Sequence, residues 1–208
     1  MQKILPGVLA MAAVVVASNI LVQFLILDGL LTWGAFTYPI AFLVTDLTNR
    51  YYGRQTAQKV VLAGFVVGVI CSLIGSQIML EYGPAVPLRI GIASGVAFLV
   101  AQMVDVAIFD KLRTGTWWRA PLASTLVGSI LDTAVFFTLA FSLSVPFYGE
   151  GANAAISWAS DSVPFLNMGA ETALWHSLAV ADWMVKVTVA LIALIPFRIL
   201  SQRAAKYS

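Results

Sequence analysis

Long apolar stretches recur along the whole chain, and they constrain the fold more than any other feature of the sequence. A helix rises about 1.5 Å per residue, so it needs ~20 apolar residues to cross the hydrocarbon core of a bilayer. Most of these stretches approach or exceed that length. The chain has 60% hydrophobic and only 11% charged residues, whereas an average soluble domain has roughly 25% charged residues. Membrane-spanning helices are therefore the predicted organisation.

We predict six transmembrane helices in a single domain that comprises residues 1–208. They are expected at about 4–27, 31–50, 57–80, 87–111, 120–145 and 177–200. The N-terminal stretch is too long for the apolar core of a signal peptide, so we interpret it as the first span. The segment 147–176 is the one long loop, and we expect it outside the membrane, with a short interfacial helix.

The distribution of basic residues predicts the orientation. Ten of the twelve basic residues fall on one side: Lys3, Arg50, Arg54, Lys59, Lys111, Arg113, Arg119, Arg198, Arg203 and Lys206. Arg89 falls on the other side, and Lys186 lies within the sixth span. We expect the protein in the cell inner membrane. Cytoplasmic loops carry an excess of Lys and Arg, so both termini are predicted in the cytoplasm. Bases scattered over short loops do not indicate a nucleic acid partner.

Polar and ionisable side chains lie at membrane depth in most of the predicted helices. An ionisable group there costs about 2.5–3.5 kcal/mol on insertion scales, so it needs a partner or a hydrated cavity. Residues three or four apart share a helix face, and four pairs have this spacing: Asn19 and Gln23, Asp46 and Asn49, Gln102 and Asp105, Asp182 and Lys186. With Asp132, they give five helices a polar stripe that we expect to face inward.

Some of these polar residues also have a simpler explanation. Asp182 and Lys186 have the favoured order of an i, i+4 ion pair, and this structural role is as good an explanation as a binding role. Asp46 lies near the cytoplasmic end, where solvent is an alternative environment. Asp105 and Asp132 lie deeper, where a lone carboxylate must be paired, protonated or hydrated.

Pro39 interrupts the second predicted helix. Proline removes one backbone hydrogen bond and clashes with the preceding turn. Broken helices at membrane depth often line substrate cavities, although packing alone explains a kink equally well. Phe36 and Tyr38 come just before the break, and an aromatic face beside polar groups suits a flat heteroaromatic ligand.

Small residues four apart indicate close helix contacts. Gly64-x-x-x-Gly68 and Gly91-x-x-x-Gly95 have this spacing, which lets two helix backbones approach in lipid. The pattern fits a compact bundle and a homo-oligomer equally well.

Five segments resemble the queuosine precursor transporters, which are grouped with vitamin uptake transporters. They are ASNILVQ (17–23), WGAFTYPIAFLVTDLTNRYYG (33–53), ASGVAFLVAQMVDVAIFDKLR (93–113), WWRAPLASTLVGSILDTAVFF (117–137) and VADWMVKVTVALIALIP (180–196). The resemblance implies a six-helix fold similar to the substrate-binding components of energy-coupling-factor importers. It also implies import of 7-deazaguanines such as 7-cyano-7-deazaguanine, for salvage into the queuosine of tRNA. The outer loop matches no pattern of the family.

A deazaguanine has an N–H and amino edge, and one carboxylate can accept both hydrogen bonds from it. Asp132 or Asp105 is expected to bind this edge, and Phe36 or Tyr38 to stack on the ring. The amide side chains are expected to bind the carbonyl and ring nitrogens, and Lys186 to offset an inward carboxylate when no substrate is bound. The predicted substrate-binding residues are Asn19, Gln23, Phe36, Tyr38, Asp46, Gln102, Asp105, Asp132 and Lys186.

We expect a transporter rather than an enzyme, with no cofactor. No Gly-x-x-x-x-Gly-Lys-Ser/Thr loop is present, so an ion gradient, a partner ATPase or metabolic trapping must supply the energy.

One His and one Cys are too few for a zinc site. Ser94 with His176 is a poor match to an intramembrane hydrolase, because no glycine lies two residues before the serine. A transporter of another purine-like or vitamin-like solute is the main alternative, and a passive channel or a structural membrane subunit is a further one.

Overall fold

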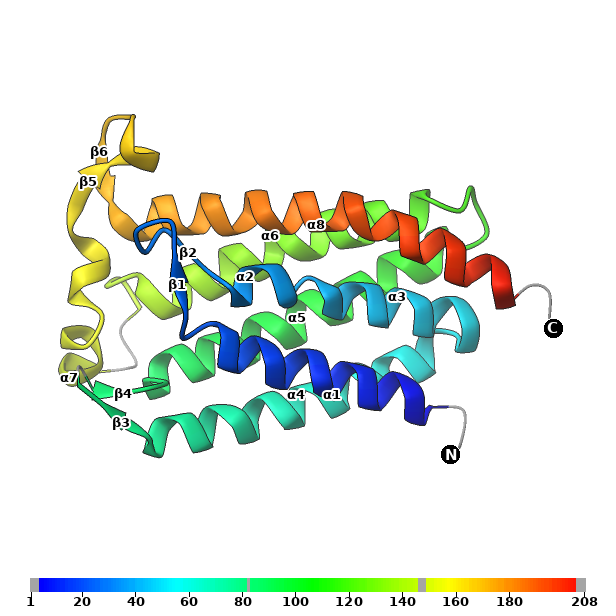
Figure 1. Cartoon of the computed structure of the whole chain (residues 1–208), viewed down its shortest axis with the longest axis horizontal. Coiled ribbons are helices and arrows are strands. Elements are labelled where there is room, and N and C mark those ends of the chain that lie inside the picture. The colour runs from blue at the N-terminus through cyan, green and yellow to red at the C-terminus, as the bar shows by residue number, and fades with distance from the viewer. Residues whose placement is uncertain (1–3, 82, 146–148, 205–208) are drawn as a thin grey trace.

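A computed structural model of the protein describes residues 4–81, 83–145 and 149–204, and most of them lie in a bundle of helices (Figure 1). Within these ranges, four helices are long and apolar enough to cross a membrane: α4 (Arg54–Gln77), α5 (Leu88–Leu112), α6 (Arg119–Phe141) and α8 (Leu174–Ala204). All four begin and end within a few residues of helices expected from the sequence. A further apolar helix, α1 (Leu5–Leu21), is shorter at 17 residues.

The predicted helix over 4–27 ends earlier, at Leu21, because the chain turns back on itself. Two short antiparallel strands, β1 (Leu25–Ile26) and β2 (Leu31–Thr32), form a hairpin after α1. Leu27 and Asp28 have φ of 52° and 54° at its tip. These left-handed conformations cannot continue a right-handed helix.

The helix predicted over 31–50 consequently begins later and is divided. Residues 31 and 32 belong to the hairpin, and the helical part consists of α2 (Gly34–Thr37) and α3 (Ile40–Tyr52). The division falls at Tyr38 and Pro39, as the proline predicts, because Pro39 has no backbone N–H to donate to the preceding turn.

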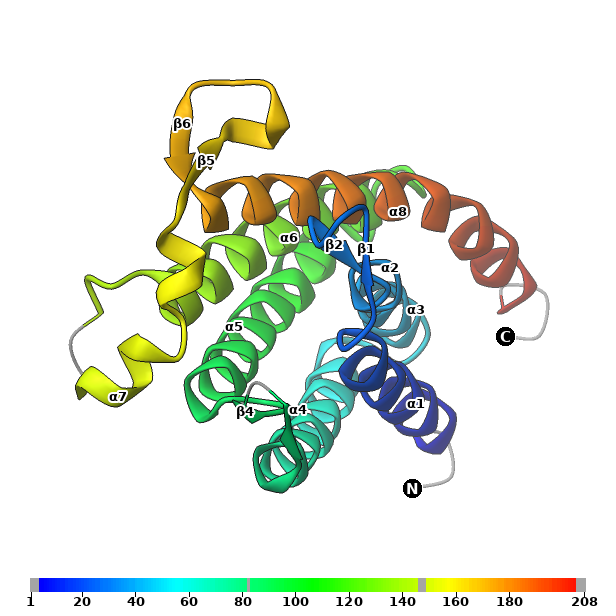
Figure 2. The same ribbon diagram turned by 60° about the vertical axis from the view of Figure 1, so that its left-hand side comes forward.

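The centre of the bundle is occupied by α3, which contacts α1, α4, α5, α6 and α8 (Figure 2). On one side of it, α5 packs between α4 and α6, and α6 in turn packs against α8. The beginning of α1 and the end of α8 lie at the same end of the bundle (Figure 1). The connections from α3 to α4 and from α5 to α6 lie at that end too.

The opposite end carries short elements instead of a single interfacial helix. A second hairpin pairs β3 (Met79–Leu80) with β4 (Gly83–Pro84) before α5. The long loop, which the sequence predicts outside the membrane and which we call the outer loop, contains α7 (Gly149–Ala154), two short 3₁₀ turns, η2 (Ser157–Ser160) and η3 (Phe165–Asn167), and the antiparallel strands β5 (Ser162–Pro164) and β6 (Glu171–Ala173). The part of the predicted loop at residues 147 and 148 lies outside the described residues.

The spaced glycines lie at helix contacts within this one chain. A Cβ added to Gly64 on α4 would lie 2.5 Å from Cγ of Met11 on α1, and one added to Gly91 on α5 would lie 3.1 Å from Cβ of Ser72 on α4. The small-residue pattern therefore serves packing of α4 against its neighbours inside the bundle.

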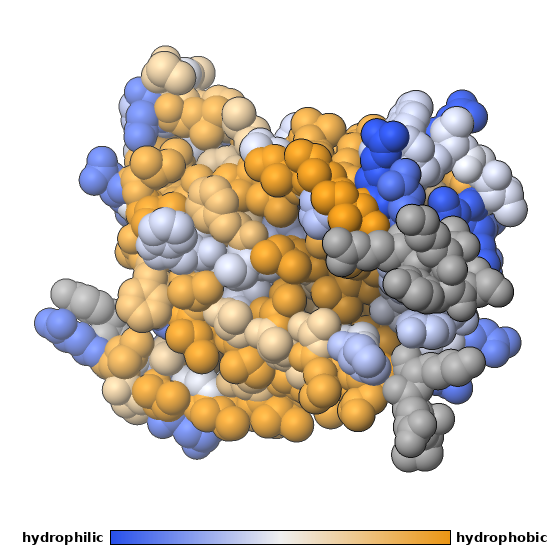
Figure 3. Space-filling model, turned by 45° about the vertical axis from the view of Figure 1, so that its right-hand side comes forward, coloured by the Kyte–Doolittle hydropathy of each residue, from blue (hydrophilic) through white to orange (hydrophobic). Residues whose placement is uncertain are grey.

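The outer surface of the bundle is apolar along its middle. Figure 3 shows apolar side chains over the middle of the face it presents, with hydrophilic side chains toward the two ends. Large apolar side chains on α4 and α8 are more than half exposed, among them Leu73, Ile192 and Ile195. An exposed apolar band of this kind is expected where a helix bundle faces lipid rather than water.

Candidate functional site

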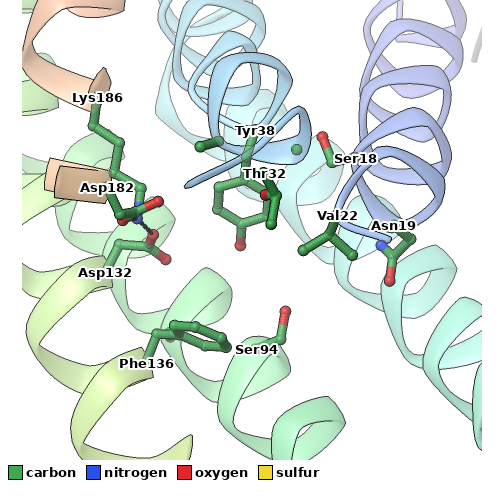
Figure 4. Close-up of a pocket in the computed structure, with 13 residues that line it drawn as sticks. Ser18, Asn19, Val22, Thr32, Tyr38, Ser94, Asp132, Phe136, Asp182 and Lys186 are labelled. Carbon is green, nitrogen blue, oxygen red and sulfur yellow. Dashed lines mark hydrogen bonds and ion pairs between the residues drawn. The ribbon is translucent and has the colours of Figure 1, made fainter. Parts of the chain in front are cut away.

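A cavity of about 120 Å³ lies between α1, the β1–β2 hairpin, α2, α5, α6 and α8 (Figure 4). Seven of its lining residues have other polar or charged side chains, and Tyr38 adds a hydroxyl at the helix break. The polar lining residues are Ser18, Asn19, Thr32, Tyr38, Ser94, Asp132, Asp182 and Lys186, and the others are Val22, Gly34, Ala35, Ala97 and Phe136.

One wall of the cavity is a buried cluster of charges. Nζ of Lys186 on α8 lies 2.6 Å from Oδ2 of Asp132 on α6 and 2.5 Å from Oδ2 of Asp182, one turn earlier on α8. Thr133 links the same groups, since its hydroxyl accepts from Lys186 at 3.1 Å and donates to Oδ2 of Asp182 at 3.1 Å. The ion pair expected from the i, i+4 spacing is present, with Asp132 as a second acid.

The charges in this wall do not balance. Two carboxylates face one ammonium group, and the side chains of Lys186 and Asp132 are each only 4% exposed. Asp182 is the more accessible acid, at 18%. A buried charge is tolerated where it is paired and hydrogen-bonded, and the second carboxylate therefore favours a ligand that donates hydrogen bonds.

Two aromatic rings point into the cavity, from the helix break and from α6 (Figure 4). Tyr38 lies between α2 and α3, and its ring packs edge-on against Phe98 at 5.9 Å between centroids. Nζ of Lys186 lies 5.9 Å from the centroid of the same ring. Phe136 is four residues after Asp132 on α6, so the two share one face of that helix.

The wall formed by α1 and α2 depends on a close approach of the two segments. Ser18 and Thr37 share a hydrogen bond of 3.0 Å between their hydroxyl oxygens. A Cβ on Gly34 would lie 2.9 Å from the backbone nitrogen of Val22, so only glycine fits there without a shift of the backbone. Asn19 donates to the carbonyl of Val15 on its own helix at 2.9 Å.

A second group of buried polar side chains lies nearer the end of the bundle where α1 begins. We define the α3–α5 cluster as Thr45, Asp46, Asn49, Gln102, Asp105 and Ser124, all of which are buried. None of these six lines the cavity described above. The hydroxyl of Thr45 donates to Oε1 of Gln102 at 2.6 Å, and this bond joins α3 to α5.

The structure thus divides the predicted substrate-binding residues into three groups. Asn19, Tyr38, Asp132 and Lys186 line the cavity, whereas Asp46, Gln102 and Asp105 belong to the α3–α5 cluster. Gln23 and Phe36 are exposed. Gln23 donates to the carbonyl of Ala85 at 3.2 Å, and the ring of Phe36 lies 6.0 Å from that of Trp33.

Five polar or aromatic cavity residues were left out of the set predicted from the sequence, namely Ser18, Thr32, Ser94, Phe136 and Asp182. The i, i+4 spacing from Asp132 to Phe136 was the available signal for the aromatic one. Ser94 does not meet His176 in this cavity, since His176 is exposed and shares a hydrogen bond with Thr172 at 2.6 Å. Across residues 4–81, 83–145 and 149–204, no group of three or more His, Cys, Asp or Glu side chains is placed to hold a metal ion.

Comparisons with known proteins point to one family. The family described as "Putative vitamin uptake transporter" matches residues 32–201. A protein named "Queuosine precursor transporter" from Escherichia coli is 32% identical over 196 residues, which cover 88% of this chain and 79% of that protein. A "Probable queuosine precursor transporter" from Haemophilus influenzae is 32% identical over 177 residues, or 79% of this chain. The match spans 66% of the Haemophilus protein, slightly less than two thirds of its length. No solved structure matches the chain.

Proposed function

The chain belongs to the vitamin uptake transporter family, in the group of the queuosine precursor transporters, and on this premise we propose that it imports 7-deazaguanine precursors of queuosine. It is a multi-pass membrane protein that acts as a transporter rather than as an enzyme. The proposed substrate is 7-cyano-7-deazaguanine or a close relative, taken up across the cell inner membrane for salvage into the queuosine of tRNA.

The charged wall of the cavity is the structural observation that best supports a 7-deazaguanine as the substrate. The six-membered ring of a deazaguanine presents an N–H and an amino group side by side, and one carboxylate accepts both in parallel hydrogen bonds. Asp132 is our candidate for this role, with Asp182 beside it and Lys186 fixing both. Lys186 holds the two acids in place when no substrate is bound.

The remaining cavity residues match the other parts of such a ligand. Tyr38 and Phe136 offer faces for a flat ring, and aromatic contacts of this kind contribute about 0.5–1.5 kcal/mol beyond the buried area. Asn19, Ser18 and Ser94 are candidates for the carbonyl and the ring nitrogens, because amide and hydroxyl groups both donate and accept. A cavity of about 120 Å³ favours a ligand of purine-base size over a large vitamin such as riboflavin.

We also propose six membrane passes with both termini in the cytoplasm. The four long helices supply four passes, α1 supplies a fifth, and α2 with α3 supplies the sixth as one broken helix. An even number of passes agrees with the positions of the beginning of α1 and the end of α8 at one end of the bundle. Arg50, Arg113 and Arg119 lie at the same end, as expected for a cytoplasmic side. A six-helix arrangement of this kind would be similar to the substrate-binding components of energy-coupling-factor importers.

Uptake of labelled 7-cyano-7-deazaguanine by a strain that cannot synthesise it tests the proposal. Asp132→Asn should reduce uptake at least tenfold, because a hydrogen bond to a charged group contributes about 1.5–3 kcal/mol. Asp110→Asn is the matched control, since Asp110 lies on the surface in a loose pair with Arg113 at 3.4 Å. Normal uptake by Asp132→Asn, present in the membrane at the wild-type amount, would contradict the assignment.

Competition separates this substrate from the alternative. Unlabelled 7-deazaguanines should displace the label, whereas riboflavin should not. Displacement by guanine at much lower concentrations than by the deazaguanines would indicate a transporter of another purine-like solute.

A further inference from the structure

The α3–α5 cluster contains two buried carboxyl groups that the proposed substrate site does not use. Asp46 on α3 and Asp105 on α5 are 2% and 0% exposed, and they interact electrostatically with each other. They lie on parts of α3 and α5 that are nearer the end with the termini than the substrate cavity is. The cluster is therefore a separate feature of the bundle.

The hydrogen bonds within the cluster leave several of its atoms without a partner. Asp46 accepts from the hydroxyls of Ser124 and Thr125 at 3.3 and 3.4 Å, which are long distances for such bonds. Asn49 donates to the carbonyl of Val106 at 3.0 Å. Among the described residues, the buried side-chain atoms without a partner of good hydrogen-bonding geometry include both carboxyl oxygens of Asp105, Oδ1 of Asn49 and Nε2 of Gln102. Three of these four atoms are oxygens. The side chains of Ser124 and Asp46 are polar neighbours that interact with Asp105.

The charged groups on the surrounding helices do not neutralise this pair. Lys186 is bonded to Asp132 and Asp182, Arg50 donates to the carbonyl of Arg113, Arg89 binds the far end of α6, and Arg198 lies over Trp117. Arg54, Lys59, Lys111 and Arg119 are exposed. Helix α1 has no charged residue. Two buried carboxylates without a base require protons or a cation, since an uncompensated buried charge is strongly unfavourable.

A small cavity runs from the helix break to Asp46, one member of this pair. It has a volume of about 10 Å³ and is lined by Pro39, Phe42, Asp46 and Thr125 together with residues of α8. That volume is about the smallest that holds one water molecule. Tyr38 lines the substrate cavity and Asp46 lines this second cavity. Asp46 is eight residues after Tyr38, so about two helical turns connect the two cavities.

We propose that Asp46 and Asp105 form the binding site of a small monovalent cation, a proton or Na⁺, whose entry down its gradient drives uptake of the substrate. Carboxylate and amide oxygens are the hard ligands that such an ion needs, and the unpartnered oxygens of Asp105 and Asn49 supply them. A bound cation offsets the repulsion of the two acids and lets α3 and α5 pack closely. The inference rests on the proposed transport function, because the coupled substrate is the 7-deazaguanine.

The protein in proteoliposomes, with labelled 7-cyano-7-deazaguanine, tests this inference. Two measurements are made: exchange of label without any gradient, and accumulation under a proton gradient alone or a Na⁺ gradient alone. We expect the wild type to accumulate label under one of the two gradients, and that gradient identifies the ion. Asp105→Asn should reduce gradient-driven accumulation at least about tenfold, within the usual range of coupling between two sites, while exchange stays near the wild-type rate.

Two further variants keep the test decisive. Asp46→Asn should behave like Asp105→Asn, and it serves in its place if the latter does not fold. Asp110→Asn, a surface acid on the same helix, should keep both activities. A readout without substrate is the thermal stability of the detergent-solubilised protein. Na⁺ in place of choline, or a lower pH, should raise the melting temperature of the wild type and leave that of Asp105→Asn unchanged.

The outcomes separate the two proposals. Exchange without an effect of either gradient, or full accumulation by both Asp105→Asn and Asp46→Asn, would overturn the cation site and leave the transport function intact. Absence of saturable exchange in the wild type would overturn the proposed function itself, and the coupling with it.

Discussion

Gly34 lets α2 approach the end of α1 more closely than a residue with a side chain would. An added Cβ would lie 2.9 Å from the nitrogen and 3.0 Å from the Cα of Val22, so the backbone itself would have to move. The same glycine lines the substrate cavity, and Tyr38 follows it one turn later. Gly34 therefore controls both packing and the shape of the site.

We expect Gly34→Ala to destabilise the protein by about 1–3 kcal/mol, as overpacking of a tight contact usually does, and to weaken uptake of the substrate. Thermal unfolding in detergent and uptake by cells measure the two effects. Gly68→Ala is the control, because the nearest atom to its added Cβ would be 3.5 Å away, an ordinary contact. Equal stability of the two variants would contradict the role given to Gly34.

The success of residue-level prediction depended on how local each contact is. The pair Asp182 and Lys186 follows from the geometry of a single helix, and it is present. Asp132, which also pairs with Lys186, lies on another helix, so residue spacing could not reveal that contact. Gln23 and Phe36 were expected to face inward because the first predicted helix continued to residue 27 and the second began at residue 31. The chain leaves the helix at residue 22, and this turn places both side chains at the surface.

Arg89 joins three elements at the end of the bundle opposite the termini. It is 2% exposed at the start of α5. Its guanidinium donates to the carbonyls of Leu139 and Ser142 at the end of α6, at 3.0 and 2.5 Å, and to the side chain of Asn153 on α7. A cation at a helix C-terminus satisfies carbonyls that have no partner within the helix and interacts favourably with the helix dipole.

We expect Arg89→Met to destabilise the protein by about 1.5–3 kcal/mol, because it leaves buried carbonyls without a charged donor, and to make the outer loop more sensitive to protease. Thermal unfolding and limited proteolysis measure these effects. Lys59→Met, which removes an exposed base from α4, should change neither. If the loop resisted protease equally in all three proteins, Arg89 would not be what holds α7 in place.

Elements differ in how clearly the sequence encodes them. Apolar runs of span length predicted the four long helices, and Pro39 predicted the division between α2 and α3. The hairpins were missed because strands of two residues are too short to show an alternating pattern. The dipeptide Asp28-Gly29 at the tip of the first hairpin was the one usable signal, since Asp-Gly favours tight turns with positive φ.

At the scale of the whole molecule, the arrangement of the polar stripes could be predicted only in part. The stripes on α3 and α5 are buried as expected, because lipid would not accept their amides and carboxylates. The sequence does not say which stripes meet, however. Asp105 and Asp132 seemed equivalent candidates for one site, whereas packing of α3 against α5 and of α6 against α8 separates them into two clusters.

Orientation in the membrane is the remaining property of the whole molecule that follows from charge. The proposed cytoplasmic end contains the loop between α5 and α6, with Thr114 exposed in it. The opposite end contains the outer loop, where Met168 is 89% exposed. If basic residues fix the cytoplasmic side, these two positions lie on opposite sides of the membrane.

Cysteine labelling in intact cells tests this orientation. Cys71 is the single native cysteine, so a Cys71→Ser background allows one new cysteine at a time. We expect Met168→Cys to react with a membrane-impermeant maleimide in whole cells, and Thr114→Cys to react only after the cells are permeabilised. The parent Cys71→Ser protein should not react in either state. Labelling of Thr114→Cys in whole cells, with Met168→Cys protected, would mean that the orientation is inverted. Labelling of both would mean that the number of passes between them is even rather than odd.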